Sequence, residues 1–402
     1  MFRLPADVRF LRASWRAHHP RRPSLAALLP ALAAAILAGC AAPPPVATAP
    51  APAAPPAPAP AAPKALVIGH RGASALRPEH TLASYARAIE DGADAVEPDL
   101  VMTRDGVLVA RHENEIGATT NVSALPQFAS RKRIKVIDGE RLDGWFTEDF
   151  TLAELKTLRA RERIPQLRRA NAQYDDQFEI PTFDEVIELV AKAAQRGGRV
   201  IALYPETKHP SYFRGIGLPL EEKLVATLRA HPYTRSAPVY VQSFESGNLR
   251  ELRQRLGAGM PNVKLVQLMG SARGRPADWR LAGDTRTYAD MMTPIGLREV
   301  ASYAGGIAPE KSSVVPRDAN GNLGTPSALV RNAHAAGLLV HPYTFRPENS
   351  FLPRNLRTGG DDAARSSGGM VREVQAFLAA GIDGFFTDDP ALGRRAVDTQ
   401  GR

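Results

Sequence analysis

The sequence predicts a (β/α)₈ TIM barrel with an inserted subdomain after the third strand. Three observations lead to this prediction. Short apolar runs alternate with longer amphipathic segments, about eight such units fit between residues 64 and 397, and one polar stretch is too long for an ordinary connection. Continuous apolar strands are typical of a parallel sheet covered on both faces. A doubly wound open sheet is the alternative, but no glycine-rich dinucleotide-binding sequence follows the first apolar run.

Residues 1–39 have the pattern of an export signal. Arginines dominate the first 22 residues, and the apolar run SLAALLPALAAAILAG that follows is shorter than a typical membrane span. The run ends in LAGC, Leu37–Cys40, which resembles the lipobox of bacterial lipoproteins, where the cysteine carries lipid. Cys40 is the only cysteine of the chain, so no internal disulfide can form, and we expect lipidation there. A plain secretory signal with an incidental cysteine is the alternative.

Residues 40–63 are expected to form a lipidated cysteine followed by a tether. Almost every residue of this stretch after the cysteine is alanine or proline, a composition that cannot bury a core and favours extended polyproline II structure. At about 3.1 Å per residue the tether would reach roughly 70 Å. The expected address is the periplasm, with the chain anchored by lipid to a bacterial membrane. Ala41, in place of an acidic residue, favours the outer membrane.

The net charge of +9 does not indicate a nucleic-acid-binding surface. Six arginines and one aspartate lie in residues 1–39, and the rest of the chain holds 45 basic and 41 acidic residues. An excess this small and this scattered lacks the basic patch that nucleic-acid binding requires. We therefore expect no nucleic-acid partner.

The barrel, residues 64–397, contains nine apolar runs, one more than it needs. The run GIAP is the shortest, and we expect it to lie outside the barrel. The nine runs are residues 65–70, 95–100, 107–112, 199–206, 239–244, 263–269, 306–309, 338–344 and 384–388. Amphipathic helices are predicted between them, at residues 81–92, 181–196 and 325–337 among others, and the first has Thr81 as its N-cap and Gly92 as its end.

Residues 113–180 do not follow the alternating pattern. The stretch is polar, rich in arginine and aspartate, and contains one helical segment at residues 151–158. Because connections inside compact domains are usually short, we expect an inserted subdomain or a lid over the site.

Polar residues are concentrated at the ends of the predicted strands, where barrel enzymes place their chemistry. Pairs two residues apart, such as Glu97 and Asp99, point to the same side of a strand. The strand-end residues are His70, Arg71, Glu97, Asp99, His112, Glu113, Glu206, Lys208, Gln242, His341, Tyr343 and Asp388.

Three of these residues, Glu97, Asp99 and Glu206, offer the hard oxygen ligands that Ca²⁺ or Mg²⁺ prefers. Buried carboxylates at three positions repel unless a positive group lies among them. A hard cation, two histidines, an arginine and a lysine suit attack on a phosphate ester, because the cations offset phosphoryl charge and histidine transfers protons near neutral pH.

Five motifs together resemble the glycerophosphodiester phosphodiesterase family, most closely its periplasmic calcium-dependent branch. They are HRGASALRPEHT, EPDLVMTRDGVLVARHE, YPETK, VHPYTFR and GFFTDDP, in the order found in the family and spread over residues 65–396. The resemblance implies a (β/α)₈ barrel with an insertion after the third strand. It also implies metal-dependent hydrolysis of glycerophosphodiesters, such as glycerophosphocholine or glycerophosphoethanolamine, to sn-glycerol 3-phosphate and an alcohol.

The resemblance also assigns roles residue by residue. It implies His70 and His112 as the general acid–base pair, Arg71 and Lys208 as phosphate-binding residues, and Glu97, Asp99 and Glu206 as ligands of Ca²⁺ or Mg²⁺. Further candidates are Glu79, Gln242 and Tyr343. The acid after the second histidine is usually aspartate, whereas here it is Glu113, so the structure must show how the imidazole is held. Glu79 either shapes the site or only favours a helix N-terminus.

Two other functions stay open. A sphingomyelinase D-like or phosphoinositide-cleaving phospholipase has a related barrel and a similar histidine pair, but it needs an exposed apolar rim, and the polar insertion favours soluble diesters. A catalytically silent lipoprotein that binds surface ligands is the second alternative. The presence of both histidines, Arg71 and all three candidate metal ligands argues against it.

Overall fold

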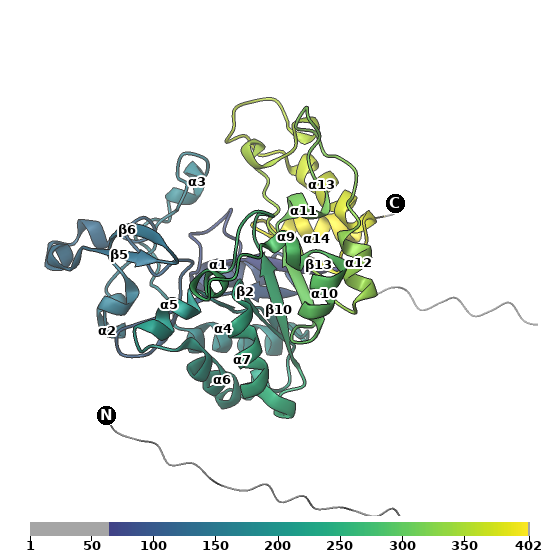
Figure 1. Cartoon of the computed structure of the whole chain (residues 1–402). Helices are drawn as coiled ribbons and strands as arrows, with labels where there is room; N and C mark the ends of the chain where they lie inside the picture. Colours follow the sequence, from purple (N-terminus) through teal and green to yellow (C-terminus); the bar gives the residue numbers. More distant parts are fainter. Residues whose placement is uncertain (1–63, 401–402) are drawn as a thin grey trace, which may run out of the picture. The chain divides into compact units, whose positions relative to one another are not determined.

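Eight parallel strand positions follow one another around a barrel in the computed structural model, which describes residues 64–400 (Figure 1). The strands are β1 (Leu66–His70), β2 (Ala95–Glu97) continuing into β3 (Asp99–Met102), β7 (Ala202–Leu203) continuing into β8 (Glu206–Thr207), β9 (Val239–Ser243), β10 (Val263–Met269), β11 (Gly306–Pro309), β12 (Leu339–Val340) and β13 (Gly384–Thr387). The predicted signal peptide, Cys40 and the tether fall outside the described residues.

The ring of strands closes between β12 and β13. β13 pairs in parallel with β1, with Gly384 opposite Leu66. On its other side, the Asp383 amide donates to the Val340 carbonyl at 3.0 Å, and the Phe386 amide donates to the Pro342 carbonyl at 3.1 Å. The predicted (β/α)₈ barrel is therefore confirmed, and the open sheet is wrong.

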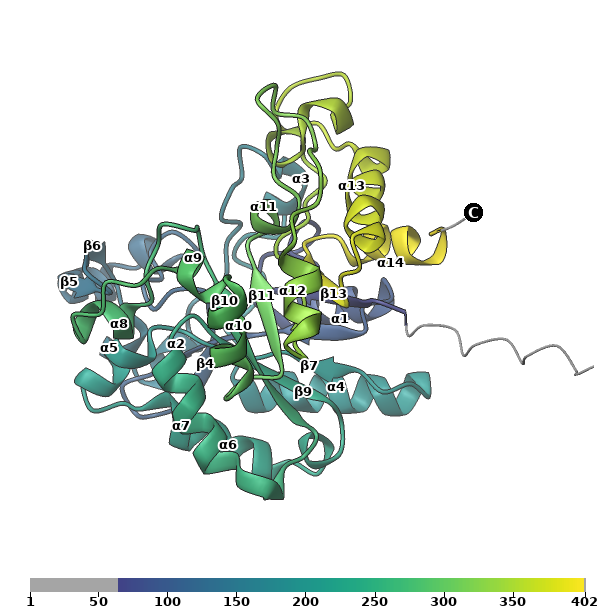
Figure 2. The same ribbon diagram turned by 45° about the vertical axis from the view of Figure 1, so that its right-hand side comes forward.

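Eight helices of the described chain cover the outside of the barrel, one after each strand position (Figure 2). They are α1 (Leu82–Glu90), α4 (Phe183–Gly197), α6 (Leu220–Ala230), α7 (Ser246–Leu256), α10 (Pro294–Ala301), α12 (Leu329–Ala335), α13 (Ser367–Ala379) and α14 (Pro390–Asp398). Shorter helices lie in the loops: α5 (Pro210–Gly215), α8 (Ala277–Leu281), α9 (Tyr288–Met291) and α11 (Lys311–Val314). No helix within residues 64–400 is long and apolar enough to cross a membrane.

The predicted start of the first helix is confirmed. The Thr81 side chain accepts a hydrogen bond from the Ser84 amide, so Thr81 is the N-cap of α1. The helix ends at Glu90, and Gly92 follows with φ of +88°, a conformation that glycine adopts without strain.

Two of the nine strand predictions need correction. The run at residues 306–309, expected outside the barrel, is β11 and pairs in parallel with β10 and β12. The surplus run is 107–112 instead, which folds as β4 (Leu108–Ala110), antiparallel to β3. Only a tight turn at Gly106 joins β3 to β4, and so short a connection can only return the chain antiparallel.

The insertion at residues 113–180 follows β4 and precedes α4, so it belongs to the second strand–helix unit of the barrel. It contains the hairpin β5 (Arg133–Ile137) and β6 (Glu140–Gly144), two short helices α2 (Leu152–Leu155) and α3 (Arg169–Ala172), and 3₁₀ turns at 122–124, 126–131 and 147–149. The predicted helix at 151–158 is shorter than expected. It begins at a Thr151–Glu154 capping box and ends after one turn.

The barrel has two apolar layers. Side chains such as Ile68, Tyr204 and Phe386 fill its interior, and a larger cluster lies between the strands and the surrounding helices. Because the interior is filled, the barrel is a rigid support, and chemistry is confined to the loops at the strand ends.

Gly72 closes the turn that follows β1. Its φ is +89°, and a Cβ atom there would lie 2.4 Å from the Ser84 hydroxyl and 2.6 Å from the Ser84 carbonyl carbon. The loop after β1 therefore packs on α1 at a distance that only glycine permits.

We predict that Gly72→Ala lowers the free energy of unfolding of the chain from Lys64 by about 2–4 kcal/mol, from strain and overpacking together. Gly106→Ala is the matched control, because Gly106 has φ of +77° but a Cβ atom there would meet nothing within 4 Å. The control should cost about 1 kcal/mol. Urea denaturation measures both variants, and equal losses would show that packing against Ser84 is unimportant.

Candidate active site

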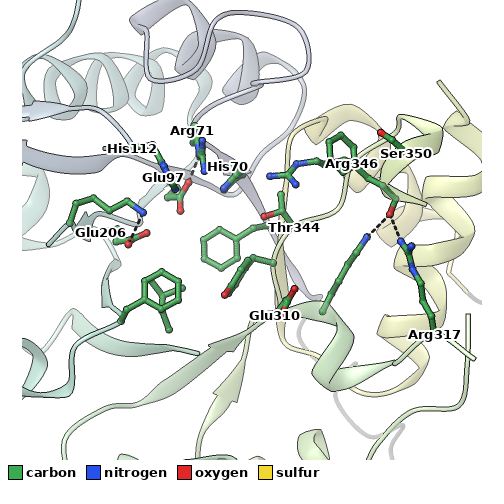
Figure 3. Close-up of a pocket in the computed structure, with 17 residues that line it drawn as sticks. His70, Arg71, Glu97, His112, Glu206, Glu310, Arg317, Thr344, Arg346 and Ser350 are labelled. Carbon is green, nitrogen blue, oxygen red and sulfur yellow. Dashed lines mark hydrogen bonds and ion pairs between the residues drawn. The ribbon is translucent and has the colours of Figure 1, made fainter. Parts of the chain in front are cut away.

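The largest group of strand-end polar residues lines one cavity of about 340 Å³ at the carboxyl ends of the barrel strands. His70 ends β1, Glu97 ends β2 and Glu206 begins β8. Figure 3 shows the catalytic candidates gathered at one end of this cavity, with Arg317 and Ser350 at the other. The structure thus brings together side chains that lie far apart in the sequence.

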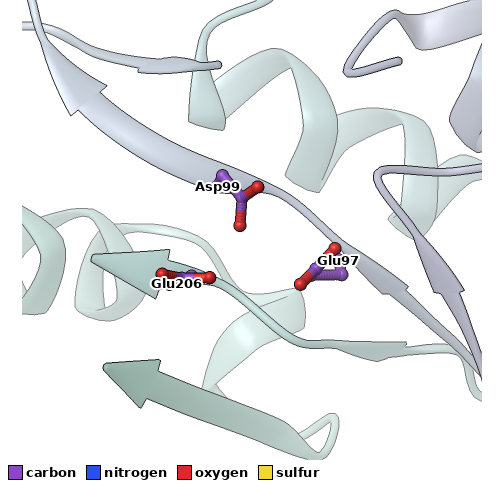
Figure 4. A group of neighbouring side chains, drawn as sticks. All are labelled: Glu97, Asp99 and Glu206. Carbon is purple, nitrogen blue, oxygen red and sulfur yellow. The ribbon is translucent and has the colours of Figure 1, made fainter. Parts of the chain in front are cut away.

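Three carboxylates converge at the base of the site (Figure 4). Glu97, Asp99 and Glu206 are buried, and each offers an oxygen within 4.8 Å of the others. Each of the two strand positions that carry these acids contains a proline, Pro98 in one and Pro205 in the other. Because proline has no amide hydrogen to donate, each position is divided into two short strands, β2 and β3 or β7 and β8. Asp99 then pairs in register with Glu206, so neighbouring strands present their acids side by side.

Burial and mutual repulsion affect two of the three carboxylates strongly. Burial, together with the other two acids, raises the pKa of Glu97 well above its usual range, and burial raises the pKa of Glu206 to about 8. The Asp99 Oδ1 atom is buried and has no hydrogen-bond donor among the described residues. A buried oxygen without a hydrogen bond, in a group of three closely spaced carboxylates, fits a divalent cation of the Ca²⁺ or Mg²⁺ type, because these cations prefer oxygen ligands.

Three neighbours partly offset this negative charge. Lys208 Nζ lies 2.8 Å from Glu206, and Arg71 Nε lies 3.7 Å from Asp99. Gln242 lies on β9, and its side-chain amide donates a hydrogen bond of 2.8 Å to Glu97. All three neighbours were predicted as site residues, and all three lie beside the cluster of carboxylates.

Each of the two histidines predicted to be catalytic is held by a carboxylate. His70 Nδ1 lies 2.6 Å from Asp388, at the end of β13, and His112 Nδ1 contacts Glu113. A carboxylate that accepts the Nδ1 proton leaves Nε2 of a neutral imidazole as a free base. Burial and then the nearby Arg71 lower the pKa of His70 to about 4, and burial with Arg71 also lowers the pKa of His112.

Glu113, the departure from the family motif, keeps the imidazole oriented. Its longer side chain still reaches His112 Nδ1, and Arg163 holds both of its oxygens, at 3.1 and 2.6 Å. Arg163 comes from the insertion, so the subdomain contributes directly to the position of His112. This residue was not predicted from the sequence, because nothing local to it marks its partner 50 positions away.

Glu79 connects two arginines. It accepts from Arg71 Nη1 at 3.0 Å and from Arg163 at 2.9 and 2.6 Å. Glu79 therefore lies in the site and orients Arg71, so a role limited to a helix N-terminus is wrong. The Arg71 backbone has φ of +58° and is held by an amide hydrogen bond to Glu97 at 2.8 Å.

Several buried groups near the site were missed or misplaced by sequence reasoning. His80, in the same loop as Glu79, lies 2.9 Å from Asp99 through Nε2 and 2.7 Å from the Tyr85 hydroxyl through Nδ1. The family motif HRGASALRPEHT contains His80, but its role needs the fold. His341 lies in the barrel interior against Tyr204 at 2.8 Å and does not line the cavity.

Tyr343 lines the cavity, and Asp388 lies behind it, in contact with His70 and Arg346, which do line it. The Tyr343 hydroxyl donates to the Met269 carbonyl at 3.0 Å, which leaves the ring facing the cavity. Asp388 also accepts from Arg168 at 2.5 Å and from Arg346 at 2.8 Å. The Asp388 carboxylate thus joins His70 to Arg168 of the insertion and to Arg346 of the loop between β12 and α13.

Comparison with known proteins agrees with this site. The model of the glycerophosphoryl diester phosphodiesterase family matches residues 70–392. The chain belongs to this family. It is 34% identical over 377 residues to a glycerophosphodiester phosphodiesterase of Arabidopsis thaliana, covering 90% of this chain and 94% of the relative. A second relative with that name, from Haemophilus influenzae, is 29% identical over 82% of this chain and 88% of its own length.

Solved structures of the family share the fold. A protein from Silicibacter pomeroyi superposes with a TM-score of 0.58 at 22% identity, covering 85% of this chain and 95% of the other. A phosphodiesterase from Oleispira antarctica, solved in complex with the product sn-glycerol-3-phosphate, has a TM-score of 0.50 at 22% identity and covers 84% and 98%. At this level of identity the likeness establishes the barrel fold of the family.

We predict that Arg163→Gln lowers kcat about 10- to 100-fold, the loss typical of residues that orient the ligands and bases of a metal site. The glutamine removes the guanidinium that anchors Glu79 and Glu113, so the acids that hold Arg71 and His112 lose a shared support. Steady-state hydrolysis of glycerophosphocholine measures the loss.

Arg161→Gln is the matched control, because Arg161 lies two residues earlier and pairs with Asp176 at 2.8 Å, away from the site. Its activity should stay within about twofold of the unchanged protein, as expected for an exposed ion pair. A comparable loss in both variants would mean that the insertion acts through its general stability.

Proposed function

We propose that the protein hydrolyses glycerophosphodiesters, such as glycerophosphocholine or glycerophosphoethanolamine, to sn-glycerol 3-phosphate and an alcohol. The observation that carries the proposal is one cavity lined by two carboxylate-held histidines beside three converging acids. The names of the relatives and the product complex of the Oleispira antarctica phosphodiesterase support the same reaction. The alternative of a catalytically silent lipoprotein leaves this arrangement without a use.

Glu97, Asp99 and Glu206 would hold a hard cation, Ca²⁺ as our first proposal and Mg²⁺ as the second. When bound, such a cation polarises the phosphoryl oxygens and offsets the charge of the diester. The three acids fit this role because they are buried, close together and include an unpaired acceptor. Cysteine is absent from residues 41–402, so a softer metal would lack its preferred ligand.

Arg71 and Lys208 would bind the remaining phosphoryl oxygens. Both cations are buried beside the carboxylates, where the low dielectric strengthens their attraction to a phosphate. Arg71 is pre-oriented by Glu79, so the ordering of the long side chain takes place during folding rather than on binding.

His70 and His112 would transfer the protons. One neutral imidazole takes a proton from the attacking hydroxyl through Nε2, and the other, once protonated, donates to the departing alkoxide. Asp388 and Glu113 stabilise the protonated rings at Nδ1. Because both rings are held in the same way, either direction of transfer fits this geometry.

We predict that His70→Ala and His112→Ala each lower kcat by about 10²- to 10⁴-fold, the usual contribution of general acid–base catalysis. Chelation should abolish turnover, and Ca²⁺ should restore it more fully than Mg²⁺. Release of glycerol 3-phosphate from glycerophosphocholine is the measurement.

His334→Ala is the control variant. His334 is an exposed residue of α12 that pairs with Asp383 at 2.9 Å and touches no part of the cavity. Full activity of either cavity variant, or turnover that is unaffected by a chelator, would contradict the proposed mechanism.

We further propose that the protein is a periplasmic lipoprotein anchored through Cys40, with the outer membrane as its preferred address. The support is the LAGC sequence, the single cysteine and the alanine–proline tether. An anchored enzyme would meet water-soluble diesters that diffuse through the same compartment.

Cys40→Ala should move the protein from the detergent-extracted membrane fraction to the soluble fraction and remove labelling by radioactive palmitate. No other cysteine can substitute, so the change should be complete. An unchanged distribution would show that the apolar run at 24–39 anchors the chain by itself.

A further inference from the structure

The active-site cavity extends beyond the carboxylates and histidines to a second group of charged side chains. These residues come from the loops after β11 and β12, the sixth and seventh strand positions of the barrel, and the mechanism proposed above assigns none of them to the phosphate or to the cation. In Figure 3, Arg317 lies on the opposite side of the cavity from Glu206. We call this group the far end of the cavity, and it consists of Glu310, Lys311, Arg317, Arg346 and Phe351.

The backbone carbonyl of Phe351 brings two of the cations of the far end together. Arg317 Nη2 donates to this carbonyl at 2.6 Å, and Lys311 Nζ donates to it at 3.4 Å. Burial lowers the pKa of Lys311, Glu373 opposes that lowering, and the charges of the two arginines of the far end add to it. The three positive side chains therefore lie close enough to act on one another.

Two of these three cations are balanced by acids of the fold. Lys311 pairs with Glu373, a residue of α13, at 2.8 and 3.0 Å. Arg346 pairs with Asp388 at 2.8 Å, and its guanidinium also lies 4.7 Å from the centre of the Phe351 ring. These contacts fix both side chains at the wall of the cavity, and their charges are offset before any substrate binds.

Arg317 and Glu310 are the charged side chains of the far end that form no ion pair with residues 64–400. Arg317 is exposed, and its guanidinium donates only to the Phe351 carbonyl. The side chain of Glu310 lines the cavity and makes neither a hydrogen bond nor an ion pair with the described part of the chain. Because neither charge is used by a partner in the fold, both are available to a bound molecule.

These two unpaired charges can recognise only one arm of the substrate. The phosphate proposed to bind at Arg71 and Lys208 carries two ester arms, and the glycerol arm has no charge. Charged groups at the far end therefore distinguish substrates by the alcohol arm. Choline and ethanolamine each supply one positive group, which Glu310 attracts and Arg317 repels. An alcohol that carries both an ammonium and a carboxylate meets an opposite charge for each of them.

We propose that Glu310 and Arg317 select the alcohol of the substrate and favour one that carries both an ammonium and a carboxylate, as serine does. The inference rests on the proposed phosphodiesterase function and makes diesters of hydroxy amino acids its preferred substrates. Arg317 binds the carboxylate, which a guanidinium can hold with two parallel hydrogen bonds, and Glu310 binds the ammonium.

The reaction itself is the hydrolysis already proposed. The oxygen of water bonds to phosphorus, and the bond from phosphorus to the serine oxygen breaks. One proton of water ends on the serine hydroxyl and the other is released. Glycerophosphoserine thus gives glycerol 3-phosphate and serine.

The test uses three diesters that differ in the charges of their alcohol. Glycerophosphoglycerol has no charged group there, glycerophosphoethanolamine has an ammonium, and glycerophosphoserine has an ammonium and a carboxylate. Release of glycerol 3-phosphate by the full chain gives kcat/KM for each, and we expect the highest value for the serine diester. Arg317→Gln should lower the ratio of the serine diester to the ethanolamine diester about three- to tenfold, through KM, as expected for charged hydrogen bonds that solvent partly screens.

A second variant separates the two roles. Glu310→Gln should lower the ratio of the ethanolamine diester to the glycerol diester by a similar factor and leave the ratio of the serine diester to the ethanolamine diester unchanged. Arg317→Lys keeps the charge and should retain part of the preference that Arg317→Gln loses. Added salt should reduce the preference of the unchanged protein, because it screens exposed charges.

The matched control is Arg357→Gln. Arg357 is an exposed arginine of the loop after β12, and like Arg317 it donates to one backbone carbonyl, that of Leu352, at 3.1 Å. It does not line the cavity. Both ratios should stay within about twofold of those of the unchanged protein, as expected for a surface substitution.

Three outcomes would overturn the inference. They are equal kcat/KM values for the serine and ethanolamine diesters, a ratio of the two that Arg317→Gln leaves unchanged, and the same fall of that ratio in Arg317→Gln and Arg357→Gln. The last would mean that these loops act through their general stability. Failure to cleave any of the three diesters is a different result, because it contradicts the proposed function itself.

Discussion

The mutual repulsion of Glu97, Asp99 and Glu206 is the constraint on which the rest of the site depends. Three buried carboxylates with oxygens within 4.8 Å of one another are stable only if positive charge is close by, since desolvation of each ion costs several kcal/mol. The barrel supplies that charge from two directions. Lys208 comes from the same strand position as Glu206, and Arg71 comes from the loop after β1. The groups that keep the folded site stable are therefore the same groups that we propose bind the phosphate.

Arg71 and the two histidines have to be positioned in turn, and a second layer of acids does so. Glu79 holds Arg71, Glu113 holds His112, and Arg163 joins the two acids. Beside the other histidine, Asp388 connects His70 to Arg168 and Arg346. Because each of these links is made by charged partners, loss of one leaves another buried charge unpaired. Two arginines of the insertion, Arg163 and Arg168, are part of these links, and each pairs with a carboxylate that contacts a histidine.

The barrel and the central residues could be predicted because their signals are local. A strand end followed by His70 and Arg71, or by Glu97 and Asp99, is visible within a few residues. What could not be predicted depends on contacts between residues that lie far apart in the sequence. GIAP appeared too short to be a barrel strand, yet pairing on both sides holds β11 in place, and the apolar run at 107–112 forms a hairpin because of the turn at Gly106. Arg163 lies in a polar stretch in which no feature of the sequence distinguishes one arginine from the others.

The insertion contributes to two different surfaces of the molecule. Toward the barrel, Arg163 fixes the acid beside His112. Toward solvent, Val136 lines an apolar groove together with Ile216 and Leu281. Both depend on the same connection between β4 and α4, so a change in its packing would alter the position of His112 and the shape of the groove together. The barrel strands are held by a filled interior and tolerate little variation in geometry. Variation within this fold is therefore most easily accommodated in the insertion, which lies outside the filled barrel and still reaches the residues beside His112.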